Sequence, residues 1–198
     1  SEVTLEPNEN YPDASERPAT VKIKAFKDIN SLKLAYESGE VDLAFGLTGE
    51  IAKELKDKKK NVIDFDAAYQ YYTFLNLEND ILKDPAVREA IDKGIDREAI
   101  KKTLDGGTIP TGLFAGYNSF DAKTAPTYNV NEAKALLDNS GWKLEDGAKY
   151  RTKDGKELAL SIKTYSSKPD LPKVSQTIAS ELEKLGIKVT VEVVDDIS

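Results

Sequence analysis

The spacing of apolar residues switches along the chain between a period of two and a period of about four. Alternation over residues 20–26 ("TVKIKAF") predicts a half-buried strand, and "INSLKLAYESG" after it predicts a short helix that ends at Gly39. Residues 41–47, 61–67 and 69–78 are predicted as further strands, with a helix over "GEIAKELKDKKK" between the first two. The first third of the chain therefore predicts a strand–helix–strand–helix–strand order, which is typical of an α/β sheet.

Two short helices are predicted next, over "DPAVREAIDKGIDREAI" (84–100). Asp84 can cap the first helix, with Pro85 at its first position, and Asp96 can cap the second. The apolar residues of the segment fall on one face of each helix, and the crowded charged residues occupy the opposite, polar arc. We interpret these charges as a solvated helix surface rather than a catalytic acid–base cluster.

The C-terminal half predicts a helix, a hairpin and a βαβ unit. The helix covers residues 129–142, with Asn131 as its cap, and the hairpin covers residues 150–165. The hairpin turns at Asp154-Gly155, a pair that favours the type I′ turn. The βαβ unit is predicted from a strand, a helix and a second strand: residues 158–164, 171–185 and 187–194.

Composition removes several classes of function. The 198 residues carry a formal net charge of −7, which argues against a nucleic-acid surface. The chain has no Cys and no His, which excludes thiolate chemistry, disulfides and imidazole metal ligands within these residues. Two carboxylate pairs remain as candidates for chemistry, Asp64 with Asp66 and Asp195 with Asp196. They leave open a small carboxylate-dependent hydrolase or metal enzyme, although solvated strand ends are the plainer interpretation.

Several segments, taken in their order along the chain, resemble the sequence signatures of a known family. The segments are "NENYPDASERPATVKIKAFKD", "LAYESGEVDLAFGL", "YYTFLNLEND", "DPAVREAIDKGIDREAIKKTLDGGTIPTG" and "YNVNEAKALLDNSGW". Together they resemble consecutive signatures of the extracellular solute-binding proteins that serve bacterial ABC importers of oligopeptides, dipeptides and nickel. The resemblance extends from residue 5 or so to residue 194. Pro12 and Gly94 are its departures from the family pattern.

The resemblance implies a fold and a role. The fold would be α/β, of the two-lobed periplasmic-binding-protein type II, with this chain as an internal fragment of a longer protein. Residues 1–75 would belong to the first lobe and end in a crossover strand, and residues 76–198 would belong to the second lobe, including the unit 158–194. The role would be to bind a peptide, or nickel or a metal chelate, without catalysis or a cofactor. The resemblance further implies delivery to the membrane permease of an ABC importer and an extracellular or periplasmic location, with any lipid anchor outside these residues.

The resemblance also indicates ligand-binding residues. In peptide-binding members an aromatic residue follows a G-[ED]-[VI]-D strand, and here that residue is Phe45, followed by Gly46. Tyrosines of the crossover strand also face the ligand in this family, which points to Tyr71 or Tyr72. Because side chains alternate along a strand, we expect one of these two tyrosines to face the ligand and the other to pack in the core.

The βαβ unit adds two more candidates. Ligands of α/β sheets bind at the carboxyl ends of the strands, so the loop after strand 158–164, with Tyr165 and Ser166, is expected to open toward the same cleft. No metal-ligating residues are indicated. The sequence does not decide between a peptide-binding and a nickel-binding member of the family, because "NENY", "AKALL" and "GW" resemble both kinds.

Overall fold

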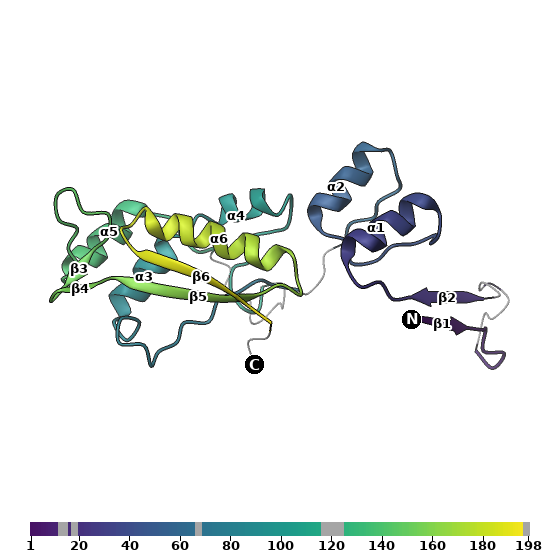
Figure 1. Cartoon of the computed structure of the whole chain (residues 1–198), viewed down its shortest axis with the longest axis horizontal. Coiled ribbons are helices and arrows are strands. Elements are labelled where there is room, and N and C mark those ends of the chain that lie inside the picture. The colour runs from purple at the N-terminus through teal and green to yellow at the C-terminus, as the bar shows by residue number, and fades with distance from the viewer. Residues whose placement is uncertain (12–15, 17–19, 66–68, 116–124, 196–198) are drawn as a thin grey trace. The chain divides into compact units, whose positions relative to one another are not determined.

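The computed structural model describes residues 1–198 except 12–15, 17–19, 66–68, 116–124 and 196–198. The chain divides into two compact units, Ser1–Lys60 and Asn61–Ser198 (Figure 1). The predicted division into lobes near residue 75 is a different one, and it stays a prediction. None of the helices within the described residues has the length and apolar character needed to cross a membrane.

The first unit begins with a two-stranded ribbon. Strands β1 (Glu2–Leu5) and β2 (Val21–Lys24) pair antiparallel, so the strand predicted over residues 20–26 is confirmed in its central part, although it is exposed rather than half-buried. Cross-strand partners share a face, which makes one face of the ribbon polar and the other aliphatic. The aliphatic face is exposed and consists of Val3, Leu5, Val21 and Ile23.

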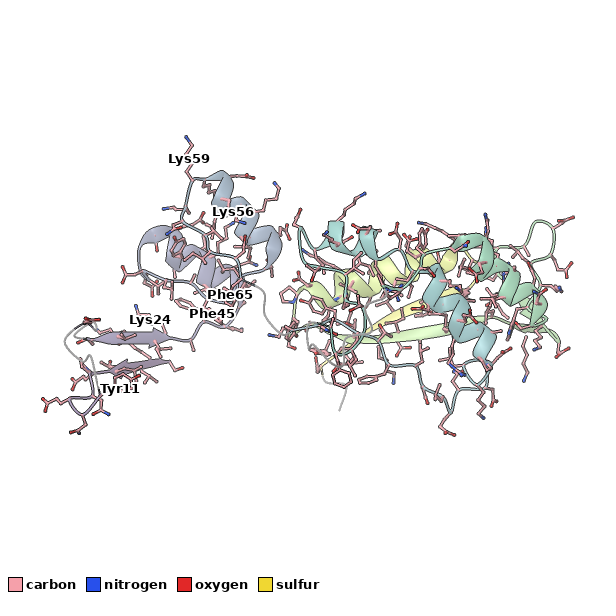
Figure 2. All side chains as sticks on the ribbon, turned by 180° about the vertical axis from the view of Figure 1, so that it is seen from behind. Tyr11, Lys24, Phe45, Lys56, Lys59 and Phe65 are labelled. Atoms are coloured by element: carbon pink, nitrogen blue, oxygen red, sulfur yellow. The ribbon has the colours of Figure 1, made fainter. Side chains whose placement is uncertain are left out.

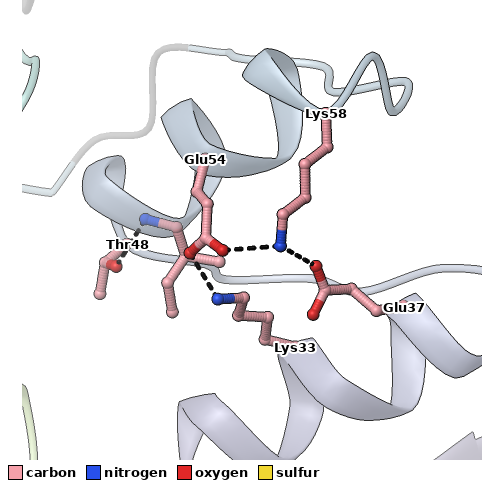
Figure 3. A network of polar contacts seen from close by, with 6 residues as sticks. Lys33, Glu37, Thr48, Glu54 and Lys58 are labelled. Carbon is pink, nitrogen blue, oxygen red and sulfur yellow. Dashed lines mark hydrogen bonds and ion pairs between the residues drawn. The ribbon is translucent and has the colours of Figure 1, made fainter.

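Two helices complete the first unit, α1 (Ile29–Ser38) and α2 (Gly49–Asp57). Helix α1 begins at Asp28, whose carboxylate accepts the backbone N–H of Ser31, and it ends at Gly39, which has a φ of 80°. Both the helix and its end at a left-handed glycine are confirmed. Helix α2 begins at Thr48, whose hydroxyl accepts a backbone N–H of the first turn (Figure 3).

Ion pairs join α1 to α2. The carboxylate of Glu54 on α2 accepts hydrogen bonds from Lys33 of α1 and, at 2.8 Å, from Lys58 (Figure 3). Lys58 Nζ also lies 2.6 Å from an oxygen of Glu37 on α1. Hydrogen bonds from Lys33 and Lys58 lower the pKa of Glu54 to about 2. The side chains of Lys58 and Glu54 are 48% and 41% exposed, so solvent screens much of the network.

Three predicted strands are absent from the described part of the chain. Residues 41–47, 61–65 and 69–78 form no ladder there. Their large apolar side chains are mostly exposed: Leu43, Phe45, Ile63, Phe65, Tyr69, Tyr72, Phe74 and Leu77. The prediction was wrong because alternation reports which side of a segment is apolar, whereas a strand also needs a hydrogen-bonding neighbour. The five-element sheet order predicted for the first third is therefore not formed.

A parallel βαβ motif organises the second unit. It consists of β5 (Ala159–Tyr165), α6 (Asp170–Glu183) and β6 (Lys188–Val194), which confirms the unit predicted over residues 158–194. The two strands pair in parallel from Ala159 with Lys188 to Tyr165 with Val194, and α6 packs along both (Figure 1). The carboxyl ends of both strands consequently lie at one edge, and the amino end of α6 follows β5 there.

Three more helices belong to the second unit: α3 (Pro85–Gly94), α4 (Arg97–Thr103) and α5 (Val130–Asn139). Asp84 and Asp96 cap α3 and α4 as predicted, each accepting backbone N–H groups of the first turn. Helix α5 is capped by Asn129, which accepts the N–H of Glu132 at 3.0 Å, so the prediction of Asn131 was wrong. Asn129 is the capping residue because it directly precedes the first helical residue, whereas Asn131 already lies inside the helix.

The predicted hairpin is confirmed in its turn. Strands β3 (Thr152–Lys153) and β4 (Lys156–Glu157) pair antiparallel on either side of Asp154 and Gly155. These two residues have φ values of 51° and 75°, the positive angles that a type I′ turn requires. The hairpin leads directly into β5.

The hydrophobic core of the second unit joins α3, α5 and α6 to the parallel strands. Its buried members include Val87, Ala90, Ile91, Ala133, Leu137, Trp142, Leu158, Val174, Ile178, Leu182, Leu185 and Ile187. Gly94, at the end of α3, lies against Leu185 so closely that a Cβ atom would collide with the Cδ1 atom of that leucine. The packing therefore explains why glycine replaces a helix-forming residue at this position.

Arg151 is a charged residue inside this core. Its side chain, in a residue only 2% exposed, donates from Nε to the carbonyl of Leu185 at 2.6 Å and from a terminal nitrogen to the carbonyl of Trp142 at 2.7 Å. The same terminal nitrogen lies 2.6 Å from an oxygen of Asp138. One guanidinium thus connects the hairpin to the chain at the ends of α5 and α6.

Candidate functional site

A group of aromatic and charged side chains lies where β5 ends and α6 begins. We call it the tyrosine cluster, and it consists of Tyr69, Tyr71, Tyr165, Lys168 and Asp170. The rings of Tyr69 and Tyr71 meet edge to face with centroids 5.6 Å apart. Lys168 Nζ lies 5.7 Å from the centroid of the Tyr69 ring, close enough for a cation–π contact. The cluster occupies the edge at which ligands of parallel sheets bind.

Tyr71 is the polar centre of the tyrosine cluster. Its hydroxyl lies 3.4 Å from Oδ2 of Asp170 and donates a hydrogen bond to it, since a carboxylate can only accept. Burial first, and then the negative charge of Asp170, raise the pKa of Tyr71 to about 12. The Tyr71 hydroxyl therefore keeps its proton at neutral pH.

Tyr72 belongs to a different aromatic pair from Tyr71. It is 60% exposed, and its ring meets that of Phe74 edge to face with centroids 5.0 Å apart. Tyr69 pairs with Tyr71, and Tyr72 pairs with Phe74, so aromatic contacts follow a two-residue period although no ladder forms. One of the two was expected to pack in the core, but neither Tyr71 nor Tyr72 is among the buried core residues. Which of them contacts a ligand stays a prediction.

Tyr165 belongs to the tyrosine cluster, and Ser166 is the next residue in the chain. Tyr165 is the last residue of β5 and half-buried, and it interacts electrostatically with Tyr71. Ser166 is exposed in the turn that follows. Helix α6 begins after this turn at Pro169, which provides no side-chain cap. The structure therefore brings Tyr71 and Tyr165 together and leaves Ser166 accessible next to them.

Phe45 and Gly46 lie in the first unit, in the segment between α1 and α2. Phe45 is 74% exposed (Figure 2), and Gly46 has a φ of 77°, which a residue with a side chain rarely adopts. These two candidates are neighbours in one turn. A common site of both with the tyrosine cluster stays a prediction, because the cluster belongs to the other unit.

Neither carboxylate pair is described in both of its members. Asp66 and Asp196 lie outside the residues that the structure describes, so each pair is described in one member only, Asp64 or Asp195. Across the described part of the chain, no group of three or more Asp, Glu, His or Cys side chains is placed to hold a metal ion.

Sequence reasoning missed three members of the tyrosine cluster: Tyr69, Lys168 and Asp170. The signal for Tyr69 was its position two residues before Tyr71, since residues i and i+2 of an extended segment share a face. The signal for Lys168 and Asp170 was the "SSKPD" stretch between β5 and α6, where a functional loop of a βαβ unit is expected.

Comparison with known proteins identifies the family. The family model described as "Bacterial extracellular solute-binding proteins, family 5 Middle" matches residues 1–197. The chain belongs to this family. The oligopeptide-binding protein AppA of Bacillus subtilis is 28% identical over 201 residues, which cover 98% of this chain and 37% of AppA. The resemblance drawn from the ordered segments is thereby confirmed.

Solved structures confirm the fold. The structure of Bacillus subtilis AppA in complex with a nonapeptide has a TM-score of 0.72 and 28% identity, and the match covers 98% of this chain and 40% of that one. The structure of NikA from Brucella suis in complex with Fe(III)-EDTA has a TM-score of 0.75 and 24% identity, over 93% of this chain and 40% of that one. Both are type II periplasmic binding proteins, so the α/β fold class predicted from the sequence is confirmed. The chain spans about two fifths of the length of these relatives.

Proposed function

We propose that this chain is part of the substrate-binding component of a bacterial ABC importer that captures peptides outside the cell and delivers them to the membrane permease. Membership of an extracellular solute-binding family and 28% identity to an oligopeptide-binding protein support the proposal. The observation that carries it is the tyrosine cluster, which gathers Tyr71, Tyr165 and Asp170 at the carboxyl end of a parallel strand. The role is capture without catalysis or a cofactor.

The chemistry of the cluster suits a ligand whose side chains vary. A protein that takes many peptides gains affinity from the backbone that all peptides share and leaves side chains in roomy, hydrated pockets. Tyrosines offer broad contact and a polar hydroxyl at little cost in conformational entropy. We assign ligand contact to Phe45, Gly46, Tyr165, Ser166 and one of the two tyrosines Tyr71 and Tyr72.

The location follows from the same proposal. A protein that hands ligands to an importer works on the outer side of the cell membrane, in the periplasm or at the cell surface. We propose an extracellular or periplasmic location, with a lipid anchor to the membrane as one way of holding the protein near its permease. Cell fractionation with an antibody against the chain tests both parts of this assignment.

A nickel ion or metal chelate is the second candidate ligand. The observation in its favour is the fold likeness to NikA, at a TM-score of 0.75, whose structure contains Fe(III)-EDTA. At 24% identity this likeness concerns the fold alone. The two candidates differ in charge and in hydrogen-bonding groups, so binding experiments separate them.

The test is calorimetric titration of the whole protein that the gene encodes. The probes are a random oligopeptide library, Fe(III)-EDTA and a nickel–histidine complex. Peptide binding is expected, and replacement of the ligand-facing tyrosine, Tyr71 or Tyr72, by Ala is expected to weaken it by roughly 1–2 kcal/mol with little change in thermal stability. Binding of metal complexes alone supports the second candidate, and binding of none of the probes contradicts both.

A further inference from the structure

The hydrogen bond between Tyr71 and Asp170 has a fixed polarity. A tyrosine hydroxyl has a single proton to donate, and here that proton is directed at Oδ2 of Asp170, 3.4 Å away. The oxygen keeps its lone pairs, so Tyr71 Oη can still accept. A ligand atom that meets this oxygen therefore has to be a donor.

The negative charge nearest to Tyr71 strengthens this polarity. Asp170, at the start of α6, places a negative charge beside the Tyr71 oxygen, and it is the carboxylate within hydrogen-bonding distance of that hydroxyl. Lys168, from the loop before α6, has its ammonium over the ring of Tyr69 at 5.7 Å. Tyr165, at the end of β5, also interacts electrostatically with Tyr71. Asp170, whose carboxylate contacts the Tyr71 hydroxyl directly, makes the Tyr71 oxygen more attractive to N–H and ammonium donors and less attractive to carboxylate oxygens. The ammonium of Lys168 acts in the opposite sense, but its contact is with the ring of Tyr69.

We propose that Asp170 is a positioning residue that holds the Tyr71 hydroxyl as a hydrogen-bond acceptor, so that this point of the site selects a ligand N–H or ammonium group. The inference rests on the proposed function and specifies its ligand chemistry. A peptide offers a backbone N–H at almost every residue and an ammonium group at its amino terminus. A carboxylate-rich metal chelate offers acceptors, which both Tyr71 Oη and Asp170 repel.

The experiment measures the coupling between one ligand donor and Tyr71. The probe is the tightest-binding peptide of a random library, with analogues in which one backbone N–H at a time is replaced by an ester oxygen and one in which the terminal ammonium is removed. Titrations use the whole protein and its variants Tyr71→Phe and Asp170→Asn. Tyr69→Phe is the matched control, because it removes a neighbouring hydroxyl of the same cluster and leaves the pair intact.

One analogue is expected to bind the parent about three- to tenfold more weakly than the unmodified peptide, the usual effect of one hydrogen bond. In Tyr71→Phe the same replacement should change affinity less than twofold, because the acceptor is gone. In Asp170→Asn the effect should also fall, since an amide can donate as well as accept and lets the hydroxyl turn toward the ligand. Tyr69→Phe should keep the full effect of the parent.

A second readout separates positioning from a loss of structure. Alkaline titration of tyrosine absorbance should show the pKa of Tyr71 falling in Asp170→Asn from about 12 toward its ordinary value, with burial still raising it, and unchanged thermal melts. If the parent binds peptides but no analogue shows coupling to Tyr71, the inference is overturned and the proposed function stands. Coupling that survives in Asp170→Asn overturns the role of Asp170. A parent that binds no peptide overturns the proposed function and this inference with it.

Discussion

Among the substitutions of polar residues proposed below and above, Arg151→Met should destabilise the second unit most. The guanidinium is buried and donates to two backbone carbonyls, those of Leu185 and Trp142, at 2.6 and 2.7 Å. Methionine fills a similar volume but donates nothing, so both carbonyls lose their partner inside the core. The perturbation therefore removes hydrogen bonds with little change in packing.

The expected loss of stability depends on whether each group that accepts from Arg151 can find another partner. Each hydrogen bond from a charged donor contributes about 1.5–3 kcal/mol, and the two carbonyls have no other route to a partner without local opening. The side chain of Asp138 is 46% exposed, so water can hydrate its carboxylate after Arg151 is removed. The ion pair therefore contributes little to stability. We expect Arg151→Met to lower the free energy of unfolding by about 3–6 kcal/mol. Arg151→Lys can keep one carbonyl contact and should lose about half as much.

The assay is urea unfolding followed by tryptophan fluorescence. The chain has one tryptophan, Trp142, and it is buried at this site, so the signal reports on the second unit without interference from the first. The variant should show a lower midpoint with an unchanged slope. A loss below 1 kcal/mol, or equal losses for Met and Lys, would show that Arg151 does not hold these carbonyls in solution.

Three further predictions follow from the packing and the charges. Gly94→Ala should cost about 1–3 kcal/mol through collision with Leu185, and the same change should cost less in a Leu185→Ala background, as urea midpoints of the four proteins would show. Glu54→Gln should lower the melting temperature above pH 4.5, and the difference from the parent should vanish as pH falls from 4.5 to about 2. The reason is that the lowered pKa of Glu54 in the folded protein stabilises the fold only while the carboxylate is ionised. The chain should self-associate through the aliphatic face of the β1–β2 ribbon, and Ile23→Lys should reduce the mass seen by light scattering; a parent that is strictly monomeric at high concentration contradicts this.

The elements predicted correctly are those whose signals are local. Asp84 and Asp96 cap their helices because the capping contact spans two or three residues, and Asp154-Gly155 forms its turn because the required angles belong to these residues themselves. The βαβ unit was placed within one or two residues at each boundary. Its strands and helix are consecutive in the sequence, so their mutual packing is almost a local property as well.

The features that sequence reasoning missed depend on distant partners. The hydrogen bond from Tyr71 to Asp170 joins residues 99 positions apart, and no periodicity reports such a contact. The side chain that leaves no room for a Cβ atom at Gly94 is that of Leu185, which is distant in the sequence. From the sequence alone, Gly94 therefore indicated only a weakened helix. The segments 41–47 and 69–78 have the composition of strands, but pairing is a property of two segments and the alternation describes only one.

The segment around Tyr71 is held in place by side-chain contacts, because it pairs with no strand in the described residues. Leu75 packs against the core of the second unit, while Tyr71 is hydrogen-bonded to Asp170 and meets the ring of Tyr69 edge to face. Side chains therefore fix the segment at points a few residues apart, and its aromatic contacts join residues two positions apart although no strand forms. Removing the Tyr71 hydroxyl would release one of these points and leave the core contact of Leu75 in place. For that reason the Tyr71→Phe variant should perturb the cluster locally, and its effect on peptide binding can be separated from any effect on folding.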